Sequence, residues 1–237
     1  GSNTRPGGPA NRVAVIRRLL SGAHHLTAAG LMRIDTAIGE ADMRAPGYLP
    51  ALLASRTDQR LSAAQQTALR LLAGWDGRAY APGETGGSSP SSTDAADVTD
   101  GPAATLFAQM RTAIVNRLFG GLPGQVVTRL NTLSSESHQY DVTPLDNLAL
   151  RVIRPHWAGL PPPSLVLVIS NRKPAAIIKH ALATSLALLT KRYGSAPDKW
   201  RRHHAVSHLD SLTGVVGPSA TEPFLDRGSW VQQVAFG

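Results

Sequence analysis

The 237-residue sequence predicts an α+β fold that is mainly helical, with a few strands towards its C-terminal end. Apolar residues recur at helical spacing through most of the chain. Capping residues, prolines and glycines stand where these patterns begin and end. The last part of the chain instead favours extended structure that is interrupted by turn residues. The elements below follow from these three observations.

We expect residues 10–80 to be at least half helical. Residues 10–20 form the first helix, which Gly22 ends. Thr27 is positioned to cap the second helix. The apolar stripe of this second helix consists of Leu31, Ile34 and Ile38.

Two prolines, Pro46 and Pro50, are expected to bracket a turn before residues 51–54. Ser62 then caps a third helix over residues 63–73. The segment Trp75–Gly77 ends that helix with a turn signal, Trp-Asp-Gly.

Residues 82–101 are rich in Gly, Ser, Pro, Thr and Asp, and have almost nothing to bury. Such a composition cannot offset the entropy of ordering, so we expect a flexible surface loop without regular structure. This loop lies inside what we take to be one unit spanning residues 1–237.

The second half of the chain begins with helices and ends with strands. A helix resumes near Ala103, and another covers residues 125–133. Pro174 suits the first turn of a long helix that reaches Arg192. The segments expected to be extended are 205–212 and 230–236. Residues 134–143 are polar, and 160–163 form a proline-rich connector.

The net charge of +8 raises the question of nucleic-acid binding. The arginines are scattered, and the densest basic cluster is Lys199, Arg201 and Arg202 beside two histidines. Phosphate binding needs several positive groups on one face, and the sequence carries no recognised nucleic-acid-binding motif. The pattern therefore does not favour a nucleic-acid partner.

The sequence also argues against cysteine chemistry, a membrane span and a metal site. Without cysteine there can be no disulfide and no thiolate nucleophile. No apolar run reaches the roughly 20 residues that span a bilayer, so no membrane partner is expected. His204, His208 and Asp210 could share one strand face as a metal-like trio, but a solvated strand face is the preferred interpretation. We therefore expect no metal and no cofactor.

Several segments, in order, resemble the penicillin acylase (penicillin amidase) family of N-terminal nucleophile hydrolases. The resemblance covers most of the chain but is poor over residues 120–163. The segments are Gly7–Val13, Leu26–Ala29, Leu49–Leu53, Leu71–Gly77, Ala104–Phe107, Leu189–Gly194 and Asp226–Trp230.

The resemblance implies that this chain is the C-terminal portion of a β subunit. The strands would then belong to a four-layer αββα sandwich when the enzyme is complete. The implied activity is hydrolysis of the amide bond of N-acylated small molecules, of the β-lactam or acyl-homoserine lactone type. The implied partners are the remaining β-subunit region and an α subunit. Family members are often periplasmic or secreted, and the family's calcium site would lie upstream.

Arg12 matches a family arginine that orients catalytic groups, and a fixed guanidinium can hold several acceptors at once. The alternative is an ordinary exposed arginine on an amphipathic helix. The family's nucleophile is a serine exposed at the β-subunit N-terminus, whose own amine acts as base. Ser2-Asn3 is similar to that start, but Arg5 stands where the family has tryptophan, and Ser2 lies too close to Arg12. We therefore expect the nucleophile to be absent from this chain.

A second hypothesis is a non-catalytic helical binding or scaffold module. Such a module would keep the acylase-like framework without its chemistry. The chain by itself is expected to be inactive under either hypothesis.

Overall fold

The structure of the protein is a computed structural model. The described residues are 10–22, 26–42, 44–57, 60–78, 97–128, 144–154, 173–205, 207–209 and 222–224.

The described part is mainly helical, as predicted. Its α-helices are α1 (Ala10–Ser21), α2 (Ala28–Glu40), α3 (Ala45–Ala54), α4 (Ala63–Ala73), α5 (Pro102–Phe119), α7 (Pro144–Ile153) and α9 (Pro174–Tyr193). A 3-10 turn follows α3 (Ser55–Thr57) and another follows α9 (Pro197–Lys199), and residues 124–128 are also helical. No described helix has the length and apolarity needed to cross a bilayer.

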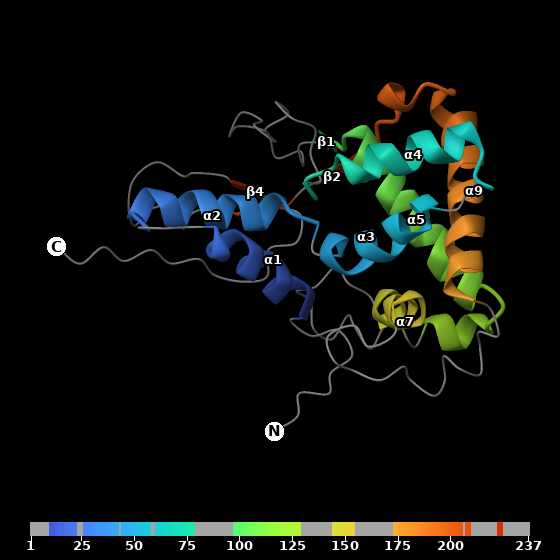
Figure 1. Cartoon of the computed structure of the whole chain (residues 1–237). Helices are drawn as coiled ribbons and strands as arrows, with labels where there is room; N and C mark the ends of the chain where they lie inside the picture. The colour runs from blue at the N-terminus through green and yellow to red at the C-terminus, as the bar shows by residue number, and fades with distance from the viewer. Residues whose placement is uncertain are drawn as a thin grey trace.

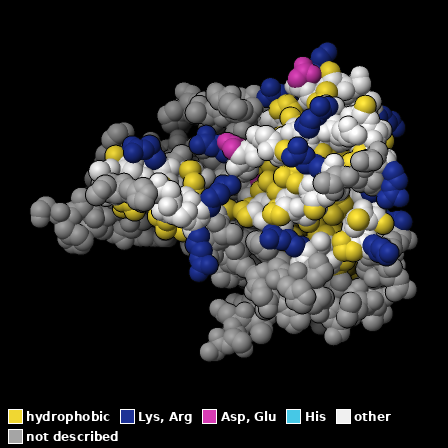
Figure 2. All heavy atoms as spheres, viewed as in Figure 1, with side chains coloured by type: hydrophobic (Ala, Val, Ile, Leu, Met, Phe, Trp, Pro, Cys, Tyr) yellow, Lys and Arg dark blue, Asp and Glu magenta, His cyan; other side chains and the backbone are white. Residues whose placement is uncertain are grey.

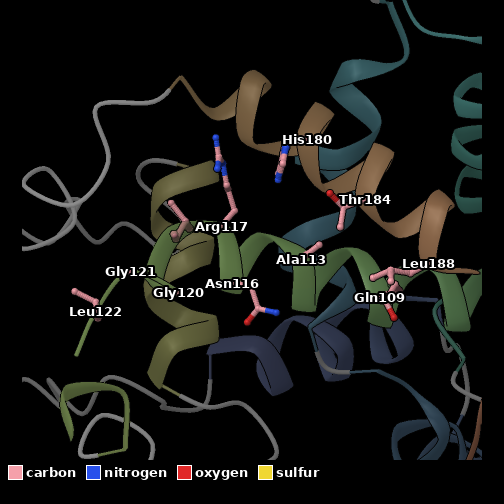
Figure 3. Close-up of a pocket in the computed structure, with 11 residues that line it drawn as sticks. Gln109, Ala113, Asn116, Arg117, Gly120, Gly121, Leu122, His180, Thr184 and Leu188 are labelled. Atoms are coloured by element: carbon pink, nitrogen blue, oxygen red, sulfur yellow. The ribbon is translucent and has the colours of Figure 1, made fainter. Parts of the chain in front are cut away.

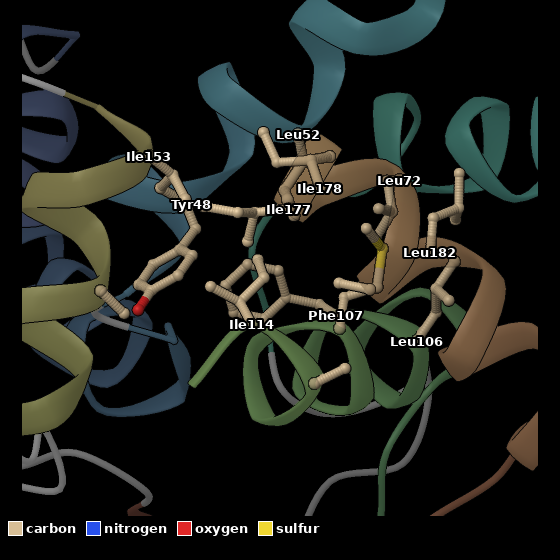
Figure 4. Close-up of a cluster of buried hydrophobic side chains, with 14 of the residues drawn as sticks. Tyr48, Leu52, Leu72, Leu106, Phe107, Ile114, Ile153, Ile177, Ile178 and Leu182 are labelled. Atoms are coloured by element: carbon tan, nitrogen blue, oxygen red, sulfur yellow. The ribbon is translucent and has the colours of Figure 1, made fainter. Parts of the chain in front are cut away.

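Helix α5 lies in the middle of the main bundle, beside α9 and against α4 and α7 (Figure 1). Its side chains Leu106, Phe107, Met110 and Ile114 are fully buried. Figure 4 shows this core, in which side chains from α3, α4, α5, α7 and α9 meet. Helices α1 and α2 lie to one side of the bundle and share a smaller apolar cluster around Val15.

Several predicted helix ends are confirmed by their capping contacts. The Thr27 hydroxyl accepts a hydrogen bond from the Gly30 amide at the start of α2. Ser62 and Gln65 form a reciprocal capping box at the start of α4. Pro174 lies at the start of α9, where its missing N–H would have had no helical partner.

The prediction of a turn between Pro46 and Pro50 is wrong, because both prolines lie in α3. Pro46 stands in the first turn, where proline costs no helical hydrogen bond. Pro50 lies inside the helix and leaves the Pro46 carbonyl without its amide donor. Arg154, just after α7, donates from Nη1 to the carbonyl oxygens of Pro46 (3.2 Å) and Gly47 (3.3 Å). A side chain 108 residues away thus replaces the missing backbone donor.

Helix α7 was not expected from the sequence. It packs against α3, α5 and α9. Its approach to α3 is close, since a Cβ at Gly47 would stand 2.6 Å from a methyl group of Leu150. Arg111 of α5 binds the buried Asp146 of α7, with Nη1 2.6 and 2.7 Å from the two carboxylate oxygens.

The described strands are short. β1 (Asp97–Thr99) pairs antiparallel with β2 (His203–Ala205), and β3 (Ser207–Leu209) pairs antiparallel with β4 (Glu222–Phe224). β1 falls inside the expected 82–101 loop, so that loop prediction extended too far. Residues 82–96 and the predicted strand 230–236 lie outside the described residues. The sandwich therefore stays a prediction.

Arg154→Met should lower the free energy of unfolding by about 1–2 kcal/mol, since the partly buried Pro46 carbonyl loses its donor. Chemical denaturation would measure this change. In a Pro50→Ala background, the restored backbone N–H can reach the Pro46 carbonyl, and the cost of Arg154→Met should shrink. An equal cost in both backgrounds would show that Arg154 does not compensate for Pro50.

Asp146→Ala should lower the free energy of unfolding by about 3 kcal/mol, because the Arg111 charge is left largely buried without its carboxylate. The double variant Arg111→Met, Asp146→Leu should recover most of that loss, since it removes both charges. Urea denaturation of the single and double variants tests this pair. A double variant as unstable as the single would contradict the explanation.

Candidate functional site

Arg12, the one catalytic residue expected from the sequence, lies in the first turn of α1. The structure describes the backbone of Arg12 and not its side chain. Its position precedes the fully buried Val15 by three residues, so both positions lie on the same side of the helix. Helix α1 packs on α2 and α3. The structure therefore places the Arg12 backbone on a helix that is anchored to the rest of the fold.

The Trp75–Gly77 turn connects α1 with the rest of the molecule. Arg18 of α1 lies beside the turn, with Nη1 3.4 Å from the Asp76 carbonyl oxygen. Gly77 has a φ of +87°, which L side chains rarely adopt. Its carbonyl accepts from the Asp42 amide at 2.9 Å, which joins the turn to the segment after α2.

Hydrogen bonds between side chains and backbone stabilise the turn. The Asp76 carboxylate accepts from the Arg78 amide at 2.9 Å. The Trp75 indole donates to the Arg78 carbonyl at 2.7 Å, and its ring lies 4.9 Å from that of Phe107. The expected turn is confirmed, and its tryptophan packs on α5.

Next to this turn, Asp42 and Arg44 form a buried ion pair. The Arg44 Nε and Nη2 atoms donate to the two Asp42 oxygens at 2.7 and 2.9 Å, and the Arg44 amide adds a third bond at 2.9 Å. Burial alone would raise the pKa of Asp42. The Arg44 charge and hydrogen bonds, with the Arg111 charge, outweigh burial and hold this pKa below its ordinary value.

The buried Tyr48 is close enough to both ion pairs to feel their charges. Its hydroxyl donates to the Asp146 carbonyl at 2.7 Å. Burial raises the pKa of Tyr48 well above its ordinary value, and the Asp146 charge adds to the effect while Arg111 and Arg44 oppose it. The phenol therefore stays protonated and works as a hydrogen-bond donor.

No pattern in the sequence indicates this group, which consists of Asp42, Arg44, Tyr48, Arg111 and Asp146. Arg111 and Asp146 lie 35 residues apart on different helices, so no helical or strand periodicity relates them. The packing of α7 on α5 brings them together. Their carboxylates are satisfied by guanidinium groups, so they are suited to holding structure rather than to transferring protons. We interpret the group as support for α1 and α3.

The remaining sequence candidates are dispersed. His204 lies in β2 and His208 in β3, which belong to separate sheets, so the proposed trio does not share one strand. Asp210 and Ser2 lie outside the described residues. The described part of the chain contains no group of three metal-ligating side chains.

The basic cluster near residue 200 is not one continuous charged face. Arg202 Nη2 lies 2.7 Å from the buried Asp100, and its amide donates to the Thr105 hydroxyl at 3.1 Å. Between the basic residues, Trp200 is buried in the core, and its indole donates to the Gly194 carbonyl at 2.9 Å. Trp200 therefore anchors this segment to the core.

Comparison with known proteins identifies the family. The family model for penicillin amidase matches residues 2–233. The solved structure of a thermostable penicillin G acylase from Alcaligenes faecalis is similar in fold, with a TM-score of 0.59 and 16% sequence identity. That match covers 92% of this chain but 39% of the acylase chain. No curated protein matches the sequence. Since the family match extends over nearly all of the sequence, the chain belongs to the penicillin amidase family.

Proposed function

We propose that this chain is the scaffold and substrate-pocket portion of an amidohydrolase that cleaves the amide bond of N-acylated small molecules. The main support is the family match over residues 2–233. The substrate would be of the β-lactam or acyl-homoserine lactone type. The remaining β-subunit region and an α subunit would complete the enzyme, and this chain spans 39% of the acylase chain that it resembles.

The nucleophile would come from the part of the enzyme outside this chain. An N-terminal serine acts only when its own free amine lies within reach of its hydroxyl, with donors for the oxyanion nearby. The described hydroxyls of Ser21, Ser55 and Thr112 each donate to a backbone carbonyl in or next to their own helix. These contacts favour structural roles for those three groups.

Arg12 would act as a positioning residue in the complete enzyme. Its helix is held by the buried Val15 and by the contact of Arg18 with the Trp-Asp-Gly turn. A backbone hydrogen bond joins the Trp-Asp-Gly turn to Asp42, and the ion pair of Asp42 with Arg44 is buried. A guanidinium at position 12 would thus project from an anchored helix, as orientation of catalytic groups requires.

The purified 237-residue chain should show no hydrolysis of chromogenic N-acyl substrates, because it lacks the nucleophile with its amine. Addition or co-expression of the remaining β-subunit region and the α subunit should restore turnover. Release of chromophore measures both states. Turnover by the isolated chain that Ser2→Ala abolishes would place the nucleophile here and overturn the proposal.

In the complete enzyme, Arg12→Ala should lower kcat by about 10², with a much smaller effect on KM, because orientation matters most in the transition state. Arg17→Ala is the matched control, since Arg17 is an exposed arginine on the same helix. Steady-state kinetics and thermal denaturation would separate loss of orientation from loss of folding. Unchanged kinetics for Arg12→Ala would reduce Arg12 to an ordinary helix arginine.

A further inference from the structure

Helices α5 and α9 carry two adjoining pockets along their junction. The larger has a volume of about 710 Å³ and the smaller about 380 Å³, and both are lined by Gln109 and Leu188. In Figure 3, Arg117 and His180 lie towards one end of the larger pocket and Gln109 and Leu188 towards the other. We call the combined depression the α5–α9 groove.

The floor of the groove follows from helical spacing. Along α5, Thr105, Gln109, Thr112 and Asn116 recur every three or four residues, so they form a polar stripe on one side of the helix. Along α9, the corresponding residues are His180, Thr184, Leu188 and Arg192. The Gln109 and Asn116 amides each offer donors and an acceptor, which are the groups that can bind a peptide backbone.

The ends of the groove are basic. Arg117 lies at one end, and Lys191 and Arg192 line the other. Neither pocket has an acidic residue among its described lining. Arg202 also lines the second end, but Asp100 already binds its guanidinium. The groove therefore combines a neutral hydrogen-bonding middle with positive charge at both ends.

The surrounding surface has the same charge bias. Of the carboxylates whose side chains are described, Asp42, Asp100 and Asp146 are buried, which leaves Asp76 and Asp198 exposed. Figure 2 accordingly shows Lys and Arg spread over one face, with little Asp or Glu between them. An occupant of the groove gains most when it is acidic.

We propose that the α5–α9 groove binds an extended acidic peptide segment from the remaining region of the enzyme. From His180 to Arg192 the helix rises about 18 Å, a length that five or six extended residues span. Leu188, 46% exposed, would contact one apolar side chain in the middle of the segment. The source of the segment rests on the proposed function, because it assumes that the enzyme has a further part.

The arrangement favours a peptide over nucleic acid. A phosphate backbone carries charge at every nucleotide and is matched by a continuous row of positive groups. Here the positive groups stand at the two ends, and the middle contains amides, hydroxyls and a leucine. An extended peptide can match both features, with acidic side chains at its ends and backbone hydrogen bonds between them.

Fluorescence anisotropy with a labelled Glu-Asp-Glu-Leu-Asp-Glu peptide tests the recognition. Arg117→Glu with Arg192→Glu should weaken binding about tenfold or more, since attraction becomes repulsion at both ends. Arg56→Glu with Arg70→Glu is the matched control, because both arginines are exposed and the change in net charge is the same. The control pair should change binding less than about twofold. An amide analogue, Gln-Asn-Gln-Leu-Asn-Gln, should bind at least about tenfold more weakly.

If both variant pairs weakened peptide binding equally, the proposal would be overturned. Such a result would show that the peptide responds to the net charge of the protein and not to the groove. The proposal also fails when the acidic peptide does not bind, when the amide analogue binds as tightly, or when duplex DNA displaces the peptide at equal charge concentration.

The source of the segment is tested in the complete enzyme with the photocrosslinking residue p-benzoylphenylalanine at position 188. A crosslink to an acidic stretch of the remaining enzyme, identified by mass spectrometry, is expected. A crosslink to a non-acidic stretch, or none, would overturn the proposal. Neither readout depends on amide hydrolysis, so failure here and failure of the proposed function are distinguishable.

Discussion

Burial of α5 between α4, α7 and α9 is the constraint from which much of the structure follows. Helix α5 exposes little of its length, and its side chains Leu106, Phe107, Met110 and Ile114 are fully enclosed. A buried helix gains from every apolar contact, but each polar group on it needs a partner. Arg111 binds Asp146 on α7 through Nη1, and the Thr105 hydroxyl accepts from the Arg202 amide. The burial of α5 thus determines where the Arg111–Asp146 ion pair and the Thr105 hydrogen bond form.

The same reasoning explains how α3 and α7 fit together. Pro50 deprives the Pro46 carbonyl of its donor, and Arg154 after α7 supplies one. Tyr48 of α3 donates to the backbone of α7 at Asp146. Gly47 removes the side chain that would collide with Leu150. These contacts set the distance and the rotation of α7 on α3, so α7 depends on tertiary partners more than on its own propensity.

For the proposed function, the bundle matters as a rigid support. The Trp-Asp-Gly turn links α1, the segment after α2 and the ring of Phe107 on α5. A shift of the bundle would therefore pass to the helix that bears Arg12. The buried charges serve this support, since their pKa values and hydrogen bonds suit fixed contacts. Under the proposed function, this chain would supply the support and the remaining part of the enzyme would supply the nucleophile. The chain spans 39% of the acylase chain that it resembles in fold.

The sequence by itself determined the features that depend on neighbours along the chain. Helix α4 could be predicted from the Ser62 cap and from apolar spacing, and α9 from Pro174 and a long periodic run, because capping and amphipathic periodicity are local. The resemblance to the penicillin amidase family was also present in the order of the motifs. Only the tertiary structure decided the continuous α3, the packing of α7 and the pairing of Arg111 with Asp146. The partners in these cases lie 35 to 108 residues apart, so the free energy that selects them comes from burial and hydrogen bonds between distant segments.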